Sequence, residues 1–327
     1  MANANEPPGG YAEIANPPQN TVVKIPRLGF GTYQIPPGYE TEQAVSAALK
    51  VGYRHIDTAA VYQNEESVGA AIKKSGLPRE ELFVTTKLWN SDHGFERTLH
   101  AFGRSLHKLE LDYVDLYLVH APGSPRTRDE TWRAMESILE AGKARAVGVS
   151  NFGVKHLEHL LKICNYRPAV NQVRTRVARL TSDLSPPFLE CYRALRIVFD
   201  YRPADNQIEL HPYNQRKDIV GYCRENGIAL EAYAPLTRGR KLNDPPLVEI
   251  AKKYHKATAQ ILIRWGLQKG FIVIAKSTNR ERMKMNLEAS LSQLPVTDFE
   301  IGPDDMAKLD ALDEKLVTDI WDPTAEP

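Results

Sequence analysis

Four residues of different types, Asp57, Tyr62, Lys87 and His120, each lie at or just beyond the end of an apolar, strand-like run. Tyrosine has a reference pKa near 10, so it is a poor acid at neutral pH unless a cation lies close to it. Lys87 could be that cation, because a unit charge about 4 Å away contributes roughly 4 kcal/mol at an effective dielectric constant near 20. Asp57 would keep Lys87 protonated, and a neutral His120 could orient a carbonyl oxygen beside the phenol. These residue types indicate a general acid that serves a carbonyl group.

The runs that carry these residues alternate with helix-like segments along the whole chain. The strand-like runs are 28–31, 53–57, 82–87, 114–120, 145–149, 228–233 and 271–275, and the helix-like ones are 40–51, 64–74, 94–109, 129–141, 153–163, 214–226, 257–269, a segment from about 279, and 303–315. Strands that alternate with helices favour a parallel arrangement, in which the carboxyl ends of the strands face one mouth. The four residues are therefore predicted to meet there.

Seven stretches of the chain, in order, resemble the aldo-keto reductase family. They are LGFGTYQ (28–34), GYRHIDTAAVYQNEESVGAAI (52–72), VTTKLWN (84–90), LDYVDLYLVHAP (111–122), GKARAVGVSNF (142–152), NQIELHPY (206–213) and IAKSTNRERMKMN (274–286). The resemblance runs from about residue 21 to about residue 315. It implies an α/β fold, a TIM (β/α)8 barrel, with NADPH bound in extended form. It also implies that Tyr62 is the proton donor and that Asp57, Lys87 and His120 support it.

The cofactor is predicted from the segment that follows the last strand-like run. No GxGxxG follows the first run, so a Rossmann dinucleotide site is not supported. Lys276, Ser277, Thr278 and Arg282 instead surround the expected start of a helix, where free backbone N–H groups and the helix dipole favour a phosphate. Lys276 and Arg282 would also satisfy a 2'-phosphate, and the sequence therefore favours NADP over NAD.

The resemblance implies further contacts to the nicotinamide end of the cofactor. Ser150, Asn151 and Gln207 would hold the carboxamide, and Tyr233 would stack on the ring. Thr32 is placed among the cofactor-binding residues in the same way. These five residues come from four separate stretches of the chain, so the barrel has to bring them together.

The resemblance also implies residues at the adenine and in the substrate pocket. Asn286 would reach the adenine, and Tyr33 and Trp89 would form pocket walls. The chain departs from the family just before Asn286, where a glutamate is frequent and Met285 stands here. No metal site is predicted, because no consistent ligand spacing is found among His55, His93, His100, His107 and His211.

Length and composition are those of one large domain. A chain of 327 residues with 42% hydrophobic residues is long enough for a single barrel with a packed core. Residues 1–20 are expected to be a loosely ordered lead-in, and residues 21–327 a single barrel domain. The segment TVVKIPRL (21–28) is expected to form a short N-terminal hairpin across the bottom of the barrel.

Charge, hydropathy and cysteine usage exclude several kinds of partner. The net charge of +1 and the pI near 7.7 provide no basic field for nucleic acid and no polybasic membrane patch. No apolar run approaches the roughly 20 residues that a membrane span requires. The three cysteines have no CxxC spacing, which suggests reduced thiols in the cytosol. We therefore expect a cytoplasmic monomer that binds a small carbonyl substrate, with neither nucleic acid nor membrane as a partner.

One segment interrupts the resemblance. YRPAVNQ (166–172) recurs as YRPADNQ (201–207), with six of seven residues identical, and 173–207 therefore looks like an insertion. Either an intron has been read through or a local duplication has left direct repeats. Because Gln207 is continuous with Ile208 to Pro212, we expect the sixth strand to come from the second copy. The extra residues would then bulge from the bottom of the barrel.

Three functions are compatible with these patterns. The first is NADPH-dependent reduction of aldehydes or ketones, with Tyr62 as the proton donor. The second is a catalytically impaired or non-catalytic member of the same family that binds the cofactor. The third is a TIM-barrel aldolase with Lys87 as a Schiff base, which would not need the phosphate-binding segment 276–282.

Overall fold

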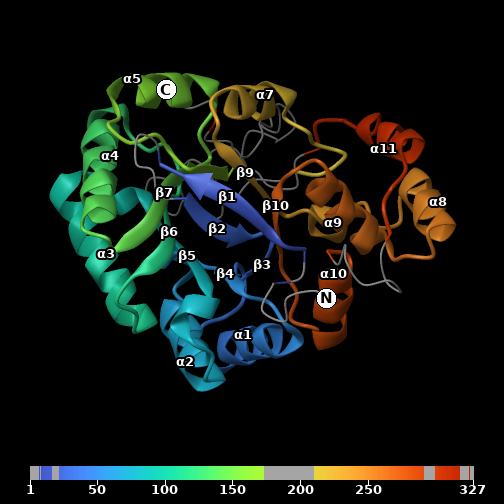
Figure 1. The fold of residues 1–327 in the computed structure, drawn as a ribbon, viewed down its shortest axis with the longest axis horizontal. Helices are drawn as coiled ribbons and strands as arrows, with labels where there is room; N and C mark the ends of the chain where they lie inside the picture. The colour runs from blue at the N-terminus through green and yellow to red at the C-terminus, as the bar shows by residue number, and fades with distance from the viewer. Residues whose placement is uncertain are drawn as a thin grey trace, which may run out of the picture.

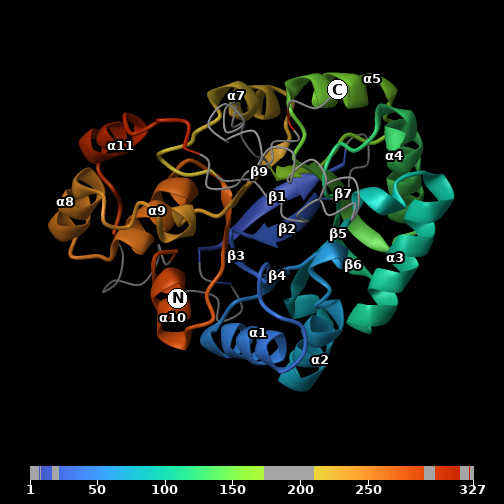
Figure 2. The same cartoon turned by 180° about the vertical axis from the view of Figure 1, so that it is seen from behind.

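The strands of the molecule close into a parallel barrel. The computed structural model describes residues 7, 9–16, 22–172, 210–290, 299–316 and 324. Eight parallel strands follow one another around the barrel in the order β10, β3, β4, β5, β6, β7, β8, β9. Figure 1 shows helices arranged around these strands, and Figure 2 shows the same arrangement from behind. The predicted fold, a (β/α)8 barrel with an N-terminal hairpin, is confirmed.

The barrel strands are short and almost completely buried. They are β3 (Leu28–Gly31), β4 (His55–Asp57), β5 (Phe83–Leu88), β6 (Val114–Val119), β7 (Ala144–Ser150), β8 (Val170–Gln172), β9 (Ala229–Tyr233) and β10 (Ile272–Ala275). Only Arg145 in β7 and Ala229 in β9 are not buried. Parallel strands are covered by side chains within the barrel and by helices outside it, which explains their apolar sequences.

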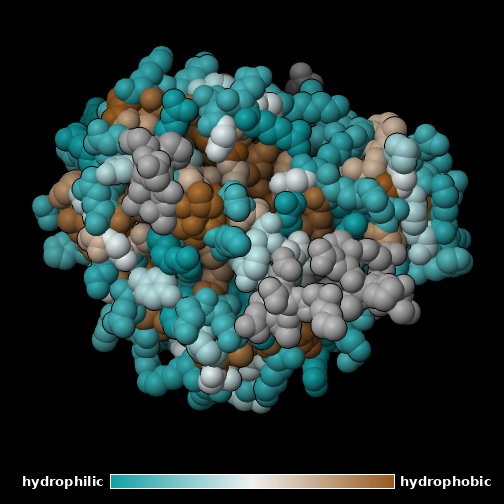
Figure 3. Space-filling view, viewed as in Figure 1, coloured by the Kyte–Doolittle hydropathy of each residue, from teal (hydrophilic) through white to brown (hydrophobic). Residues whose placement is uncertain are grey.

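The outer ring consists of helices with one apolar face. They are α1 (Tyr39–Val51), α2 (Glu65–Ser75), α3 (Phe95–Leu109), α4 (Pro125–Glu140), α5 (Val154–Ile163), α7 (Lys217–Glu225), α8 (Pro245–Lys253), α9 (Thr258–Gln268), α10 (Arg280–Glu288) and α11 (Pro303–Asp310). In α3, for example, Ala101, Phe102 and Leu109 face the core, while the basic and acidic side chains face outward. Figure 3 shows the result, a face on which hydrophilic residues predominate. The helix α8 was not predicted from the sequence.

A two-stranded hairpin covers one end of the barrel. Its strands, β1 (Tyr11–Ala15) and β2 (Val22–Pro26), are antiparallel, and Figure 1 shows them lying across the barrel. The side chain of Asn16 fixes the hairpin to the barrel, because its Nδ2 donates to the carbonyl of Val147 at 2.8 Å. The first strand therefore lies inside the segment 1–20 that we expected to be loosely ordered, and that expectation is wrong for residues 11–15.

The barrel interior is mostly apolar at the amino ends of the strands, with the hydrogen-bonded pair His55 and Thr85 as an exception, and polar at their carboxyl ends. The apolar cluster contains the hairpin residues Ile14, Val23 and Ile25 and the barrel residues Phe83, Leu116, Leu118, Ala146, Val170, Ile272 and Ile274. Side chains two residues apart in a strand point to the same face. Lys87 therefore points inward together with Phe83, and His120 follows the inward-facing Leu118. The predicted catalytic residues Lys87 and His120 therefore lie on the mouth side of this apolar cluster.

The sixth strand is built from the first copy of the repeat, and the expectation that it comes from the second copy is wrong. In β8, Asn171 pairs with Val149 of β7 and Val170 pairs with Ala229 of β9. The physical reason is connectivity. The helix α5 ends at Ile163, and residues 164–169 lead directly into the space between β7 and β9. The second copy, including Gln207, lies outside the described residues.

The described residues on either side of the segment 173–207 lie at the mouth of the barrel. They are Gln172, at the carboxyl end of β8, and Leu210. The backbone N–H of Leu210 donates to the carbonyl of Tyr233, at the carboxyl end of β9, at 3.3 Å. The segment 173–207 itself, which was expected to bulge from the bottom of the barrel, lies outside the described residues.

Candidate active site

The stagger of the strands brings three of the four predicted catalytic residues together. Asp57 of β4 is paired with Thr85 of β5, and Lys87 is two residues further along the same face. Lys87 is in turn paired with Leu118 of β6, and His120 is two residues beyond it. From β4 to β5 to β6, each of the three side chains thus enters the interior two residues closer to the mouth than the one before it. A lysine side chain is long enough to reach back to the aspartate below it.

Asp57 and Lys87 form a buried ion pair. The Nζ of Lys87 lies 2.7 Å and 2.8 Å from the two carboxylate oxygens of Asp57 and 2.9 Å from the carbonyl oxygen of Thr58. The exposed fractions of the two side chains are 0% and 1%. Burial raises the pKa of the Asp57 carboxyl, and the charge of Lys87 opposes that shift. All three N–H bonds of the ammonium are satisfied, as a buried charge requires.

Tyr62 lies beside this pair on a short helix, η1 (Ala60–Tyr62). Its ring centroid is 5.2 Å from the Nζ of Lys87 and 5.7 Å from the centroid of the His120 ring, which it meets edge to face. The buried side chain of Asn64 holds the segment in place. Its Nδ2 donates to the carbonyl of Thr32 at 3.0 Å, and its Oδ1 accepts from the hydroxyl of Thr58 at 2.9 Å. The structure therefore brings the predicted catalytic four together, and Asn64 is a supporting residue that the sequence did not indicate.

The two predicted pocket walls lie on either side of this group. The ring centroids of Tyr33 and Tyr62 are 5.2 Å apart, and those of Trp89 and His120 are 5.1 Å apart. Tyr233, which was predicted to stack on nicotinamide, lies with its ring centroid 5.9 Å from that of Tyr33. The aromatic group beside the ion pair therefore consists of five rings, those of Tyr33, Tyr62, Trp89, His120 and Tyr233.

The residues predicted for the nicotinamide carboxamide lie next to His120. Asn151 donates through Nδ2 to the carbonyl of His120 and, at 2.9 Å, to the hydroxyl of Ser150. The hydroxyl of Ser150 donates to the carbonyl of Gln172 at 3.1 Å. Thr32, on the opposite side, donates to the carbonyl of Asp57 at 3.1 Å. Gln172 thus occupies the position in the barrel that the sequence assigned to Gln207.

The predicted phosphate-binding residues surround the start of α10. Asn279 caps the helix, with its Oδ1 accepting from the backbone N–H of Arg282 at 3.0 Å. The hydroxyl of Ser277 accepts from the backbone N–H of Asn279 at 3.1 Å. The side chains of Lys276, Thr278 and Arg282 are exposed. The two cations are therefore accessible to an anion at a helix start, where the dipole adds to their attraction.

Asn286, the residue predicted to reach the adenine, lies further along the same helix. Asn286 is buried at 3% exposure, whereas Met285, which departs from the family pattern, is 40% exposed.

Gln172 connects the ion pair to a second buried carboxyl group that the sequence analysis missed. Its Nε2 donates to Oδ2 of Asp57 at 3.2 Å and to Oε1 of Glu231. Glu231 is completely buried, and burial, followed by the charge of Asp57, raises its pKa to about 8. The available signal was its position in ALEAY, two residues before Tyr233, which places both side chains on the inner face of β9.

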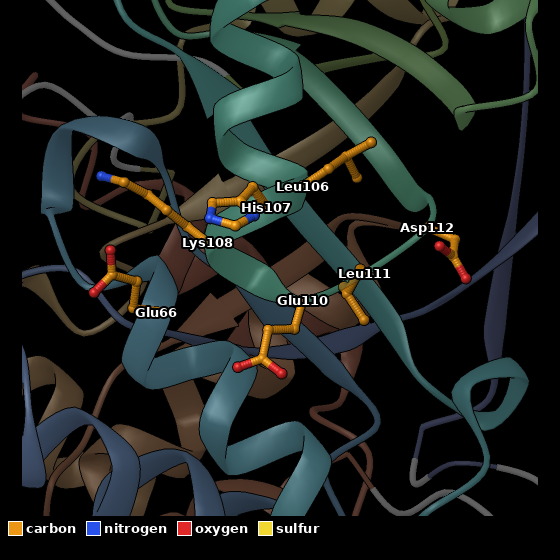
Figure 4. Close-up of a pocket in the computed structure, with 7 residues that line it drawn as sticks. All are labelled: Glu66, Leu106, His107, Lys108, Glu110, Leu111 and Asp112. Atoms are coloured by element: carbon orange, nitrogen blue, oxygen red, sulfur yellow. The ribbon is translucent and has the colours of Figure 1, made fainter.

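An open hollow elsewhere on the surface does not belong to this site. It has a volume of about 570 Å³ and is lined by Glu66, Leu106, His107, Lys108, Glu110, Leu111 and Asp112, as Figure 4 shows. Residues 110–112 lead into the amino end of β6, the end of the barrel opposite to Tyr62 and Lys87. Within the described ranges, no cluster of His, Cys, Asp and Glu side chains could hold a metal ion. No described helix is long and apolar enough to cross a membrane.

The fold and this group of side chains define a class of protein, the (β/α)8 barrels with an ionisable site at the carboxyl ends of the strands. The family model described as the Aldo/keto reductase family matches residues 27–199 and 189–313. The chain belongs to the aldo-keto reductase family, whose members are oxidoreductases that act on carbonyl compounds.

Similar proteins and structures cover almost the whole chain. It is 43% identical to a glyoxal reductase of Bacillus subtilis over 292 residues, which are 89% of this chain and 90% of that protein. An aldo-keto reductase from a Medee basin deep-sea metagenome library superposes with a TM-score of 0.76 at 38% identity, over 92% of this chain and 96% of that one. An aldo-keto reductase of Bombyx mori in complex with NADP superposes with a TM-score of 0.72 at 33% identity, over 94% of this chain and 95% of that one.

Proposed function

We propose that this protein reduces aldehydes or ketones to alcohols with NADPH, and that Tyr62 donates the proton. The observation that carries the proposal is the buried Asp57–Lys87 pair, whose ammonium nitrogen lies 5.2 Å from the centroid of the Tyr62 ring. An ion pair in a dry interior acts on its neighbours with little screening. The cation favours the phenolate form of Tyr62 and so makes the phenol a stronger acid.

The residues present fit NADPH. At one end, Lys276 and Arg282 provide two exposed cations for phosphate beside the start of α10. At the other end, Ser150, Asn151 and Gln172 provide amide and hydroxyl groups that suit a carboxamide. The complex of the Bombyx mori relative with NADP supports the same choice. When bound, NADPH supplies the hydride that reduces the carbonyl carbon.

Each catalytic residue has one role in this proposal. Tyr62 donates its hydroxyl proton to the carbonyl oxygen as negative charge develops there. Lys87 stabilises the resulting phenolate, and Asp57 keeps Lys87 charged. His120 orients the carbonyl oxygen toward the phenol. The aromatic walls Tyr33 and Trp89 keep water away from the reacting atoms.

The first test is NADPH oxidation with a panel of carbonyl compounds. Small aldehydes, dicarbonyls such as glyoxal and methylglyoxal, and open-chain sugars form the panel, because the similarity to a glyoxal reductase points to dicarbonyls. Tyr62→Phe should lower turnover by about 10²- to 10⁴-fold, the contribution of a positioned general acid, while NADPH affinity stays almost unchanged.

Tyr39→Phe is the matched control, since Tyr39 is 76% exposed on α1. Equal turnover in the Tyr62 and Tyr39 variants would remove Tyr62 from the role. A wild-type protein that binds NADPH but reduces no member of the panel would be a non-catalytic family member.

The choice of cofactor is tested at Arg282. Arg282→Ala should weaken NADPH binding by about 1.5 to 3 kcal/mol, the contribution of a charge-assisted hydrogen bond, and should hardly affect NADH. A fluorescence titration measures both affinities, with Arg133→Ala, an exposed arginine on α4, as the control. Equal losses for the two cofactors would contradict the assignment of Arg282 to the 2'-phosphate.

A further inference from the structure

Glu231 is a third ionisable group in the barrel interior, beside Asp57 and Lys87. Its side chain is completely buried on the inner face of β9. A single amide connects it to the pair, because the Nε2 of Gln172 donates to Oε1 of Glu231 and to Oδ2 of Asp57. A primary amide nitrogen carries two hydrogens, so Gln172 can bridge both carboxyl groups at once. Moving one carboxyl group therefore affects the position of the other.

In the part of the chain that the structure describes, the barrel interior contains two carboxyl groups, Asp57 and Glu231, and one ammonium group, Lys87. The Nζ of Lys87 donates to both oxygens of Asp57 and to the carbonyl of Thr58, and no hydrogen bond from it reaches Glu231. Among the described residues, Oε2 of Glu231 has no hydrogen-bond partner. A carboxylate buried without a cation is costly, whereas an uncharged carboxyl group is far less so. Neutral Glu231 is the form that this arrangement favours.

The other groups around Glu231 agree with this charge count. Gln172 of β8 is its partner in the register, and Ile272 of β10 is paired with it on the other side. Asp57 raises its pKa, and Lys87 lowers it. The described residues of β8 and β10 include no other titratable group. Burial has the largest effect, and the pKa of Glu231 is raised to about 8.

We propose that Glu231 is a positioning residue for proton transfer: while uncharged, it holds Gln172 and Asp57 against Lys87, and once ionised, it offsets the charge of Lys87 beside Tyr62. This inference rests on the proposed function. The added negative charge makes Tyr62 a weaker acid, so the ionisation of Glu231 sets the alkaline limit of carbonyl reduction.

The catalytic test is the pH profile of kcat for carbonyl reduction with NADPH. Glu231→Gln keeps an acceptor oxygen for Gln172 but cannot ionise. Its alkaline limb should move upward by about one pH unit, so that turnover on that limb is about tenfold above wild type. The matched control is Glu65→Gln. Glu65 is another buried carboxyl group, 2% exposed, which accepts from the hydroxyl of Thr86 at 2.7 Å and belongs to α2. In Glu65→Gln, the alkaline limb of the pH profile of kcat should stay at the same pH as in wild type.

A second measurement does not depend on activity. An unfolded glutamate has a pKa of about 4.3, and the folded value is about 8. Between these values the folded protein holds one more proton than the unfolded chain. The folding equilibrium constant of wild type, relative to Glu231→Gln, should therefore fall about tenfold per pH unit across this window and stay level above it. Denaturant unfolding at several pH values measures the ratio.

The outcomes separate the two proposals. A shifted limb together with the pH-dependent stability ratio supports the role of Glu231. A pH-dependent ratio with an unshifted limb makes Glu231 a buried carboxyl group without a part in proton transfer, and a flat ratio shows that it is not held uncharged. Either result overturns the inference and leaves reduction by Tyr62 standing, whereas a wild-type protein inactive on every carbonyl removes both. If Glu231→Gln does not fold, Glu231→Met, an unbranched side chain of similar length, provides the same comparison.

Discussion

The two ends of the barrel each contain a buried aspartate with a basic partner, and they use it differently. At the mouth, Asp57 is paired with Lys87, whose side chain is 0% exposed. Toward the amino end of β6, Asp115 is also buried, but its partners Arg79 and Arg145 are 20% and 44% exposed. The same carboxylate also accepts from the backbone N–H of Val84 at 2.9 Å. The Asp57–Lys87 pair is inaccessible to solvent, whereas the two arginines that bind Asp115 are partly exposed.

The difference in hydration determines what each charge can do. Arginines that remain in contact with water are screened, so the group around Asp115 ties β5, β6 and β7 together without a strong field beyond it. Lys87 is inaccessible to solvent, so its charge is less screened at the Tyr62 ring. In the proposed mechanism, similar ion pairs thus stabilise the bottom of this barrel and increase the acidity of Tyr62 at its mouth, in line with the division between stability and catalysis in such folds.

The largest expected effect is at Lys87. Lys87→Met removes the cation beside Tyr62 and leaves Asp57 buried without a partner. Turnover should fall by about 10²- to 10⁴-fold, and the free energy of unfolding should fall by about 3 to 5 kcal/mol, as when a buried pair loses one member. Steady-state kinetics and denaturant unfolding measure the two effects.

The double variant Asp57→Asn/Lys87→Met separates these effects. It should recover stability, because no unpaired charge remains, but it should not recover turnover. Recovery of turnover in the double variant would contradict a direct role for the cation.

Replacement of Asp115 should lower stability without lowering turnover, in contrast to the double variant. Asp115→Ala leaves two arginines and the Val84 N–H without their acceptor, so the free energy of unfolding should fall by about 3 kcal/mol. The kcat for reduction should not change. Asp112→Ala, an exposed aspartate two residues before β6, is the control and should be neutral in both measurements. A loss of turnover at Asp115 without a loss of stability would end the distinction between the two pairs.

The smallest effect is expected at Arg145. It is the more exposed of the two arginines, and Arg79 still satisfies Asp115 when Arg145 is removed. Arg145→Ala should lower the free energy of unfolding by about 1 kcal/mol or less, with a smaller loss at high salt. If Arg145→Ala lowers the free energy of unfolding as much as Asp115→Ala does, the charges around Asp115 are screened by solvent no more than the Asp57–Lys87 pair.

The sequence predicted that the four proposed catalytic residues meet because each lies at or just beyond the carboxyl end of a strand, and parallel strands end at one mouth. It did not reveal Glu231, since a glutamate within a short strand-like run reads equally well as an exposed residue. Its burial depends on the barrel closing over it. The first strand of the hairpin was missed for a related reason. Asn16, directly after that strand, is held by a hydrogen bond to Val147, which lies far away in the chain.

The sixth strand shows a different limit of sequence reasoning. The two copies of the repeat end in the same residues, NQ, so their local preferences do not distinguish them. The short connection from α5 decides in favour of Val170–Gln172. Only the three-dimensional path of the chain contains that information. The family resemblance could assign a glutamine to the nicotinamide carboxamide, but it could not decide between Gln172 and Gln207.

The point at which the repeat interrupts the chain bears on how such a barrel tolerates changes in length. Gln172 is the last inward-facing residue of β8, and the described chain stops directly after it. One residue added within the strand would turn Gln172 outward and break its bridge between the two carboxyl groups. Residues added after Gln172 shift no side chain in any strand. A gene can therefore gain or lose whole segments at this junction without changing which side chains of each strand face inward. The charged residues inside the barrel keep their positions.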